Sequence, residues 1–299
     1  MKKNIIFFGG AGFLGNYFCQ KLVSLGNKVT VIDLKFPKIR IKKVKYVKGD
    51  MCNQKFISKF IKKGSYIFNF AGNASIEGSN EFPLNAQKLN IMGNSTILEV
   101  CKKKNIARYI YASSLYVFSK YGGFYKATKQ SCELLIQEYN KNYKIPFTII
   151  RFGSLYGPGA GRGNAIYDLI SMAYKNRSIN YWGQGNEIRQ YIHARDAAKI
   201  CEQIFDKTFE NNYTLLSGHE DIRISDLLET ISEMLSFKIR IRCKLNKRSI
   251  HHYKNTPYNI VENQNFVPQL GEKFVFKSYT DLRQGLFECI HYFINHDLR

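Results

Sequence analysis

The sequence predicts an α/β fold: a Rossmann-type, doubly wound parallel sheet followed by a smaller, mixed C-terminal lobe. The first half of the 299-residue chain alternates β-branched apolar runs with amphipathic helical patterns. Such alternation is typical of βαβ units, which build parallel sheets. In addition, the first apolar run leads directly into a glycine-rich turn and a helix, which is the local context of a dinucleotide-binding turn.

The first unit of this series contains the glycine-rich turn. Residues 4–8 are expected to form a strand and residues 9–15 (GGAGFLG) the turn, with a helical pattern that begins at Phe13. The glycines fit both G-x-G-x-x-G, counted from Gly10, and G-x-x-G-x-x-G, counted from Gly9. A pyrophosphate can approach such a backbone closely, and the free N–H groups of the helix start then face the phosphates. A glycine-rich turn of another kind of α/β protein is the alternative.

The second strand of the series ends in an acidic residue. Residues 28–33 are β-branched, and Asp33 lies 18 residues past Gly15, close to the spacing of about 20 expected for a carboxylate that binds an adenosine ribose. A carboxylate accepts a hydrogen bond from the 2′-hydroxyl and repels a 2′-phosphate, which favours NAD over NADP. Lys35 is close enough in sequence to leave NADP open.

Strands and helices continue to alternate up to residue 151. Further strands are expected at 44–48, 66–70, 107–112 and 146–151, and helices at 56–61, 84–104 and 125–140. In a doubly wound sheet, ligands bind at the carboxyl ends of the strands. The residues expected at those ends include Asp33, Asp50, Ala71, Ser114 and Arg151.

The second half of the chain is less regular. Helices are expected at 165–174, 195–206, 226–235 (capped by Ser225) and 279–296, and strands at 179–182, 187–193 and 213–216, while the polar stretch 244–270 is not assigned. We therefore predict an NAD-binding domain at 1–163, to which the segment of about 187–217 returns, and a substrate-binding lobe at 164–299.

Composition limits the classes of partner and compartment. The chain carries 45 basic and 23 acidic residues, a net charge of +22, which suggests an anionic partner. The lysines are spread along the whole chain and no nucleic-acid-binding motif accompanies them, so we expect no nucleic acid partner. No apolar run reaches the roughly 18 residues of a membrane span, so we expect no membrane partner. The seven cysteines are scattered without a C-x-x-C pair, which favours a cytoplasmic protein without a metal site.

A Y-x-x-x-K pair is the candidate catalytic element. The chain contains three such pairs, Tyr17/Lys21, Tyr116/Lys120 and Tyr125/Lys129, and with 20 tyrosines chance alone yields about two. The first lies in the helix behind the glycine turn, and the second precedes any clear helix. Only the third opens an amphipathic helix just downstream of a strand that ends at Ser114, so Tyr125 and Lys129 are chosen.

These motifs together resemble the extended short-chain dehydrogenase/reductase family, in its NAD-dependent sugar-nucleotide epimerase/dehydratase branch. The resemblance covers nearly the whole chain. It rests on Gly9-x-x-Gly12-x-x-Gly15, Asp33, Gly49-Asp50-Met51, Phe70-Ala71-Gly72, Ala112-Ser113-Ser114, Tyr125/Lys129, Arg151, Leu155-Tyr156-Gly157-Pro158 and Gly183-x-Gly185-x-x-x-Arg189-x-Tyr191-Ile192-His193-x-x-Asp196.

The resemblance implies a role for each matching residue. Tyr125 would be the catalytic base, Lys129 would favour its phenolate, and Ser114 would hydrogen-bond the same sugar hydroxyl. The residues that would bind NAD are Gly9, Gly12, Phe13, Leu14, Gly15, Asp33, Asp50, Met51, Phe70, Ala71, Gly72, Tyr125 and Lys129. The residues that would bind a nucleoside-diphosphate sugar are Ser154, Asn164, Trp182 and Arg189, of which Arg189 would contact the diphosphate and Trp182 could instead belong to the core.

Departures from the family pattern narrow the reaction. Leu115 and Tyr116 stand where dehydratases of this branch carry acids, and the glutamate of related decarboxylases is absent. The resemblance therefore implies oxidoreduction at C4 of the sugar, as in a sugar-nucleotide 4-epimerase. A C4 dehydrogenase or 4-keto reductase, and a non-catalytic NAD-responsive binding protein, stay open. By analogy with the family, helices 84–104 and 125–140 would pair in a homodimer.

Overall fold

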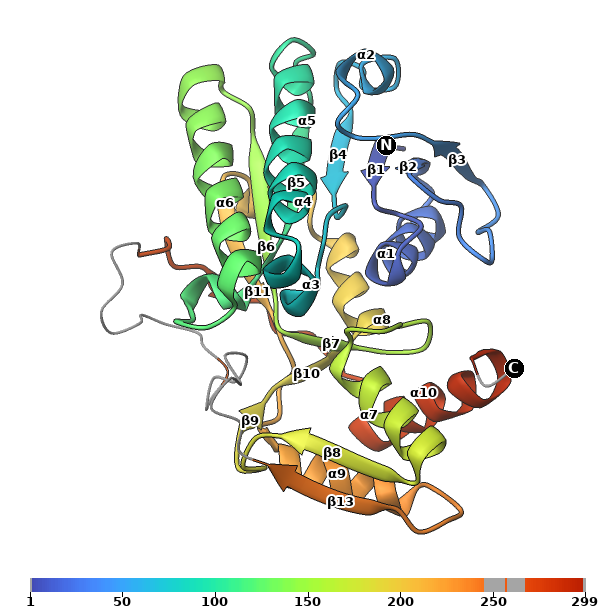
Figure 1. Ribbon diagram of the computed structural model, residues 1–299. Helices are drawn as coiled ribbons and strands as arrows, with labels where there is room; N and C mark the ends of the chain where they lie inside the picture. Colours follow the sequence, from blue (N-terminus) through green and yellow to red (C-terminus); the bar gives the residue numbers. More distant parts are fainter. Residues whose placement is uncertain (1, 245–255, 257–266, 298–299) are drawn as a thin grey trace.

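The computed structural model describes residues 2–244, 256 and 267–297 and is built on one parallel sheet of eight strands (Figure 1). The strand order is β14-β11-β6-β5-β4-β1-β2-β3. The order turns back beside β1, as in a Rossmann fold, which confirms the predicted α/β class. The strands are β1 Asn4–Phe8, β2 Lys28–Asp33, β3 Val44–Lys48, β4 Tyr66–Asn69, β5 Arg108–Ser114, β6 Phe147–Phe152, β11 Asn212–Leu216 and β14 Glu272–Lys273.

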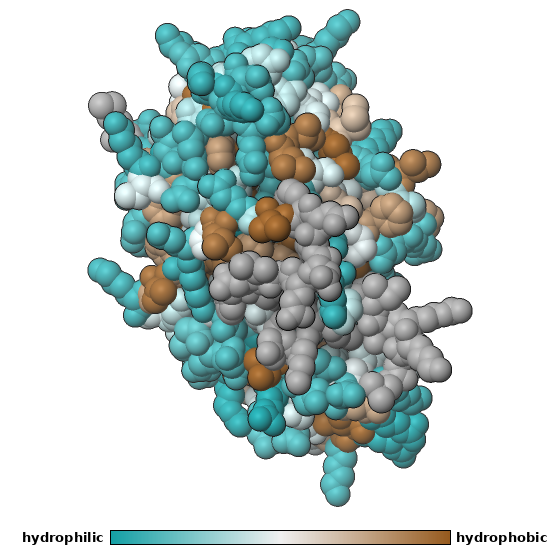
Figure 2. Space-filling view, turned by 90° about the vertical axis from the view of Figure 1, so that its left-hand side faces the viewer, coloured by the Kyte–Doolittle hydropathy of each residue, from teal (hydrophilic) through white to brown (hydrophobic). Residues whose placement is uncertain are grey.

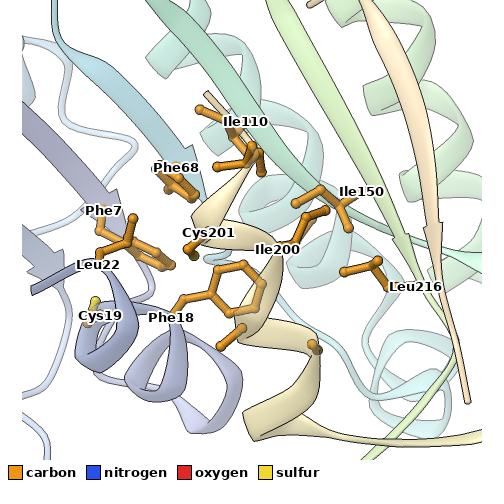
Figure 3. Packing of buried hydrophobic residues seen from close by; sticks show 14 of the residues in the cluster. Phe7, Phe18, Cys19, Leu22, Phe68, Ile110, Ile150, Ile200, Cys201 and Leu216 are labelled. Atoms are coloured by element: carbon orange, nitrogen blue, oxygen red, sulfur yellow. The ribbon is translucent and has the colours of Figure 1, made fainter. Parts of the chain in front are cut away.

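Helices cover both faces of this sheet. On one face, α1 Phe13–Ser24 and the 3₁₀ segment η3 Ala198–Glu202 pack against strand residues such as Phe7 and Phe68 (Figure 3). On the other face lie α2 Gln54–Ile57, α5 Gly93–Lys102 and α6 Gly123–Tyr143. Successive strand residues point to opposite faces, so Phe7 belongs to the first cluster and Phe8 to the second. Burial on both faces explains why central strands such as β1 and β4 are apolar runs, whereas the edge strand β3 alternates and is only half-buried.

The helix predicted at 84–104 is continuous but irregular. It consists of α4 Pro83–Gln87, a π-helical turn η1 Lys88–Met92 and α5, and it follows α3 Ile76–Glu81, which the sequence did not indicate. Asn90 in the π turn accepts a hydrogen bond from the Asn73 backbone N–H (2.7 Å) and donates one to the Thr128 hydroxyl on α6 (2.9 Å). The π turn thereby ties the loop after β4 to α6.

The smaller lobe packs around a third buried apolar cluster. It contains α7 Ala165–Asn176, α9 Ile224–Glu233 and α10 Leu282–His296, with β8 Ser178–Trp182 and β13 Arg240–Lys244 paired in parallel (Figure 1). The other short elements are β7 Ser154–Tyr156 paired with β10 Tyr191–His193, β9 Ile188–Arg189 paired with β12 Ile222–Arg223, the helix α8 Ala194–Ala197 and the 3₁₀ segments η2 Leu115–Phe118 and η4 Lys207–Phe209. None of the helices in the described ranges is both long and apolar enough to span a bilayer.

Three predictions about the second half are wrong in detail. Arg223 precedes α9 as its N-cap, so Ser225 lies inside the helix and bonds the Asp226 carboxylate (3.0 Å) instead of capping. The strand expected at 187–193 is interrupted at Gln190, because β9 and β10 pair with different partners.

The helix expected at 195–206 also ends early, at Glu202. Beyond Glu202, the backbone carbonyls of Ile204 and Asp206 bond to a side chain of β5. They accept hydrogen bonds from the guanidinium of Arg108 (2.7 and 3.1 Å). Within the stretch that was not assigned, residues 245–255 and 257–266 lie outside the described residues.

Candidate active site

The glycine-rich turn joins β1 to α1 at the carboxyl edge of the sheet. Gly9 adopts a φ of +80°, a left-handed conformation that glycine reaches without steric cost, and a Cβ there would lie 2.5 Å from the Ala71 nitrogen. A Cβ on Gly15 would overlap the Gly9 carbonyl oxygen. Gly9 is therefore the turn glycine, and the packing of the protein itself requires both Gly9 and Gly15.

Gly12 differs, because packing does not require a glycine there. A Cβ on this exposed residue would meet only the Gly9 carbonyl oxygen, at 3.4 Å. Gly12 is the N-cap of the 12-residue helix α1, and no side chain in the described ranges caps it. The first-turn N–H groups, which include those of Phe13 and Leu14, therefore stay available for an anion at the positive end of the helix. This open, donor-rich cradle fits the pyrophosphate of NAD.

Alanine substitutions should separate these two requirements. We expect Gly15→Ala to lower the free energy of unfolding by about 2–4 kcal/mol, because its methyl group meets backbone. Gly12→Ala should stay within about 0.5 kcal/mol of the native protein but bind NAD at least ~10-fold more weakly, because its methyl group occupies the approach of the phosphates. Denaturant unfolding and NAD titration measure both effects. Gly161→Ala, whose Cβ would meet nothing within 4 Å, is the control. Normal NAD affinity in Gly12→Ala would contradict the assignment.

Asp33 ends β2 next to this turn. One carboxylate oxygen accepts a hydrogen bond from the Ala11 N–H (3.1 Å), and the other is 3.4 Å from the Lys35 nitrogen. The side chain is only half-buried. A carboxylate fixed at this edge, with remaining acceptor capacity, is in the place expected for recognition of a ribose hydroxyl.

The residues predicted at the ends of β3 and β4 differ in where their side chains lie. Asp50 is exposed and accepts a hydrogen bond from the Cys52 N–H (2.8 Å), and Gly72 adopts a φ of +143° at the end of β4. Met51 packs in the core, where a Cβ on Gly93 would lie 2.5 Å from its Cε. The Phe70 ring packs against other core rings, among them Phe18 at 4.7 Å. Met51 and Phe70, like Ala71, can therefore border a cofactor through their backbone.

Tyr125, Lys129 and Ser114 meet at the carboxyl end of β5. All three are buried, with exposed fractions of 8%, 8% and 6%. Ser114 accepts a hydrogen bond from the Tyr116 N–H (3.2 Å), and the ring of Tyr116 packs edge-on against the ring of Tyr125 (6.2 Å). The first turn of α6 therefore sits over the end of β5, and the structure brings the three predicted catalytic residues together.

The ammonium of Lys129 is held by the protein on two sides. It donates to the Ala112 carbonyl of β5 (2.8 Å) and lies 4.9 Å from the ring centre of Tyr111 and 5.8 Å from that of Tyr125. Burial lowers the pKa of Lys129 to about 8, against the opposing effects of Cys132 and Glu133. A cation this close to a phenol ring favours the phenolate form of Tyr125.

The four predicted substrate residues occupy the second lobe and the strands that lead to it. Ser154 lies in β7, and Arg189 in β9 is buried and donates to the Ile188 carbonyl (2.8 Å). Asn164 caps α7 by accepting from the Tyr167 N–H (3.3 Å) and donates to the Leu155 carbonyl (2.7 Å), so its side chain has a structural role. Trp182 is 48% exposed at the end of β8, so it is not a core residue.

Sequence reasoning missed a buried ionic cluster directly behind the catalytic residues. Glu133 on α6 accepts hydrogen bonds from Ser113 of β5 and Arg151 of β6. Arg151 was predicted as a strand-end residue and as part of the family pattern, but without a partner or a role. The signal that could have found Glu133 was an acid four residues after Lys129, on the same face of the helix.

Known protein families and curated proteins include relatives of this chain. A sequence profile described as the NAD dependent epimerase/dehydratase family matches residues 5–214. Protein CapI of Staphylococcus aureus is 24% identical over 332 residues, which cover 98% of each chain. A trifunctional UDP-glucose 4,6-dehydratase/UDP-4-keto-6-deoxy-D-glucose 3,5-epimerase/UDP-4-keto-L-rhamnose-reductase of Arabidopsis thaliana is 25% identical over 287 residues, and the match spans 86% of this chain but only 42% of the plant protein.

Solved structures share the fold over the full length. A UDP-N-acetylglucosamine 4-epimerase from Methanobrevibacter ruminantium, in complex with UDP-N-acetylmuramic acid, superimposes with a TM-score of 0.80 at 24% identity and covers 99% of each chain. A UDP-glucose 4-epimerase from Thermotoga maritima, with UDP-glucose, superimposes with a TM-score of 0.79 at 18% identity, covering 99% of this chain and 100% of its own.

Proposed function

The chain belongs to the NAD-dependent epimerase/dehydratase family, and from this premise we propose that it is a sugar-nucleotide 4-epimerase. NAD is its cofactor. The substrate would be a nucleoside-diphosphate sugar, whose C4 hydroxyl is oxidised to a ketone and then restored with the opposite configuration. The observation that carries the proposal is the cluster of Tyr125, Lys129 and Ser114 at the sheet edge that also holds the glycine turn and Asp33.

Each catalytic side chain has one task in this scheme. Tyr125 removes the proton from the C4 hydroxyl and returns it to the ketone oxygen later. Ser114 hydrogen-bonds that same oxygen and stabilises the charge that develops on it. The ammonium of Lys129 keeps the phenolate of Tyr125 accessible near neutral pH, where a free phenol with a pKa of about 10 is a poor base. Bound NAD supplies the hydride acceptor and donor.

The residues after Ser114 support C4 chemistry without loss of water. Leu115 is buried in a small apolar cluster with Val117 and Phe118, and Tyr116 packs on Tyr125. No carboxylic acid therefore stands in the positions next to Ser114 from which a leaving hydroxyl could be protonated. The solved structures named above are 4-epimerases as well.

A panel of nucleoside-diphosphate sugars tests this proposal. The purified protein, with NAD, is incubated separately with UDP-, GDP-, CDP- and dTDP-sugars, and the products are identified by chromatography and mass spectrometry. We expect one sugar to give a C4 epimer of unchanged mass with no net change in NADH absorbance. Stoichiometric NADH would instead show net oxidation at C4, by a C4 dehydrogenase or by a 4-keto reductase that runs in reverse. NAD binding with no product from any sugar would favour a non-catalytic NAD-responsive protein.

Asp33 should set the choice of cofactor. We expect Asp33→Asn to weaken NAD binding by about 10-fold, because a charged acceptor for the ribose hydroxyls is lost, and to weaken NADP binding less or not at all, because the repulsion of its phosphate is lost too. Titrations with both cofactors give the ratio. Asp226→Asn, which changes an exposed carboxylate on α9 in the smaller lobe, is the matched variant for charge. An unchanged NAD-to-NADP ratio in Asp33→Asn would show that Asp33 does not select the cofactor.

We also propose that Arg189 binds the diphosphate and that Ser154 and Trp182 border the sugar nucleotide. Arg189 is a buried guanidinium, which suits bidentate phosphate recognition. Trp182 offers an exposed ring face for a base, and the ammonium of Lys244 lies 5.8 Å from its ring centre. Asn164 would act on the substrate pocket only through the backbone that it holds.

A homodimer through the helical stretch α4–η1–α5 and helix α6 is the proposed assembly. These elements expose large apolar side chains, namely Leu84 (80%), Met92 (58%) and Leu134 (44%). Figure 2 shows the face toward the α6 side, where apolar residues form small groups in a largely hydrophilic surface. Buried on association, such groups would help two copies pair.

We place the protein in the cytoplasm, because all seven of its cysteines are free thiols.

A further inference from the structure

A buried ion pair lies directly behind the catalytic residues. The guanidinium of Arg151 donates through Nε and Nη2 to the two carboxylate oxygens of Glu133 (3.0 and 2.8 Å), and the side chains are 0% and 1% exposed. The Ser113 hydroxyl donates to the same carboxylate (2.6 Å). Ser113 and Arg151 are direct cross-strand partners on β5 and β6, so both point at Glu133 from the same face of the sheet.

Two aromatic rings and a backbone carbonyl hold Arg151 in place, in addition to the Glu133 carboxylate. Its guanidinium carbon lies 4.6 Å from the ring centres of both Phe118 and Tyr213, and Nη1 donates to the Gln269 carbonyl (2.6 Å). A guanidinium held between two rings and bonded in three directions has little freedom to follow a displaced carboxylate. Glu133 therefore has a rigid, charged counterpart.

The ion pair is connected to the catalytic pair through α6 and β5. Glu133 lies one helical turn after Lys129, and the two side chains bind consecutive residues of β5: Lys129 binds the Ala112 carbonyl and Glu133 the Ser113 hydroxyl. The next residue of that strand is Ser114. These two attachments fix how far α6 is shifted along β5, and hence where Tyr125 stands relative to Ser114.

We propose that Glu133 is a positioning residue for the Tyr125–Lys129 pair, supplying the buried negative charge that supports the Lys129 ammonium, and that Arg151 sets the strength of that charge. The effect of Glu133 on catalysis rests on the proposed function, because Tyr125 is the base of that reaction. The effect of Glu133 and Arg151 on the Lys129 ammonium concerns only this chain and can be measured without a substrate.

The groups around Lys129 make the direction of each effect definite. Tyr125, Cys132 and Glu133 face it from α6, Tyr111 faces it from β5, and Arg151 of β6 reaches it through Glu133. Burial lowers the pKa of Lys129 to about 8, while Glu133 raises it. The pKa of the Tyr111 phenol is raised well above its usual value by burial, so this ring stays neutral.

Two amide variants therefore act in opposite directions. Glu133→Gln removes the negative charge and leaves the Arg151 cation uncompensated, so both effects lower the pKa of Lys129. Arg151→Gln leaves the carboxylate uncompensated, so the pKa of Lys129 rises. The double variant Glu133→Gln/Arg151→Gln removes both charges and should lie between the two. Both single variants should also lose stability, because each leaves a buried charge unpaired. Opposite shifts of the Lys129 pKa therefore test the electrostatic coupling, and the pH dependence of turnover tests the positioning role.

The experiment is an NMR titration of protein labelled with ¹³C at the ε-carbon of lysine, with the Lys129 signal assigned by its loss in Lys129→Met. We expect its midpoint to move down by about one pH unit in Glu133→Gln and up by a similar amount in Arg151→Gln. Midpoints that move in the same direction, or do not move, would overturn the proposal. If a single variant does not fold, Glu133→Met/Arg151→Met, which replaces the pair with apolar groups, must lower the midpoint relative to the native protein or the proposal fails.

Turnover provides the second readout. With the substrate found in the panel, the alkaline limb of kcat against pH should move down in Glu133→Gln and up in Arg151→Gln, because activity requires the Lys129 ammonium. If no sugar is turned over, the proposed function fails while the NMR titration still decides the role of Glu133. If the NMR midpoints move as expected but the limb of kcat does not, Glu133 is not a positioning residue for catalysis.

Discussion

Replacing Tyr125 with phenylalanine is expected to lower kcat by about 10²–10⁴-fold, the contribution of a well-placed general base. The substitution removes one oxygen from a residue that is 8% exposed, and the ring can keep its edge-on contact with Tyr116. The fold is therefore left intact, and so are the glycine turn and Asp33 at the NAD site. We expect an unchanged free energy of unfolding within about 1 kcal/mol. NAD affinity should change by less than about threefold, which is under 1 kcal/mol.

The same helix offers a matched control. Tyr143 ends α6 with 47% of its surface exposed, so Tyr143→Phe is the same chemical change far from the site. It should leave kcat unchanged. Steady-state kinetics, NAD titration and denaturant unfolding of both variants give the comparison. Full activity in Tyr125→Phe would remove the base assignment and return the choice to the other two Y-x-x-x-K pairs.

The structure already separates Tyr125 from those pairs by position. Tyr17 donates to the Pro158 carbonyl (2.9 Å) behind the glycine turn, where burial raises the pKa of its phenol. Lys120 lies beyond the end of η2, with its ammonium 5.5 Å from the ring centre of Tyr121. Position relative to a strand end therefore distinguishes the three identical spacings, because the sheet brings only strand ends to the cofactor edge, and Tyr125/Lys129 stays the predicted pair.

What the sequence predicted well depends on short-range rules. Five of the first six strands follow from largely apolar runs that are buried, the edge strand β3 follows from an alternating pattern, and Gly9, Gly15 and Asp33 follow from a turn whose geometry is local. Their positions needed no knowledge of distant residues. The same holds for Tyr125 and Lys129, which one helical turn brings together.

What the sequence did not predict depends on contacts between distant segments. Glu133, Ser113 and Arg151 come from three elements, and only the β5–β6 register places the latter two side by side. β14 is two residues long and exists because it pairs with β11, whose residue Leu215 lies 58 positions before its partner Lys273. Propensity carries no information about such pairings, because tertiary context decides them.

The Lys129 site should also show a conflict between stability and activity. Burial lowers the pKa of Lys129 from 10.5 to about 8, so at pH 7 the fold holds an ammonium that would be better solvated in the unfolded chain. A shift of this size corresponds to about 3 kcal/mol of destabilisation. The hydrogen bond to the Ala112 carbonyl offsets about 1 kcal/mol when it is lost. Lys129→Met should therefore raise the free energy of unfolding at pH 7 by about 1–2 kcal/mol while abolishing most of the turnover.

The pH dependence has a definite sign. A lysine whose pKa is lowered by folding contributes its full stability above the unfolded pKa of 10.5 and loses it as the pH falls toward the folded value of about 8. The native protein should gain stability from this group between pH 8 and 10.5, and Lys129→Met should lack that gain, so the advantage of the variant disappears as the pH rises.

Denaturant unfolding at pH 7, 8, 9 and 10 measures the difference between the two proteins, in which the titration of all other groups cancels. Lys141→Met, at an exposed position of the same helix, should differ from the native protein by a constant amount over this range. A Lys129→Met protein that is less stable than the native one at pH 7 would show that the contacts of the ammonium outweigh its desolvation.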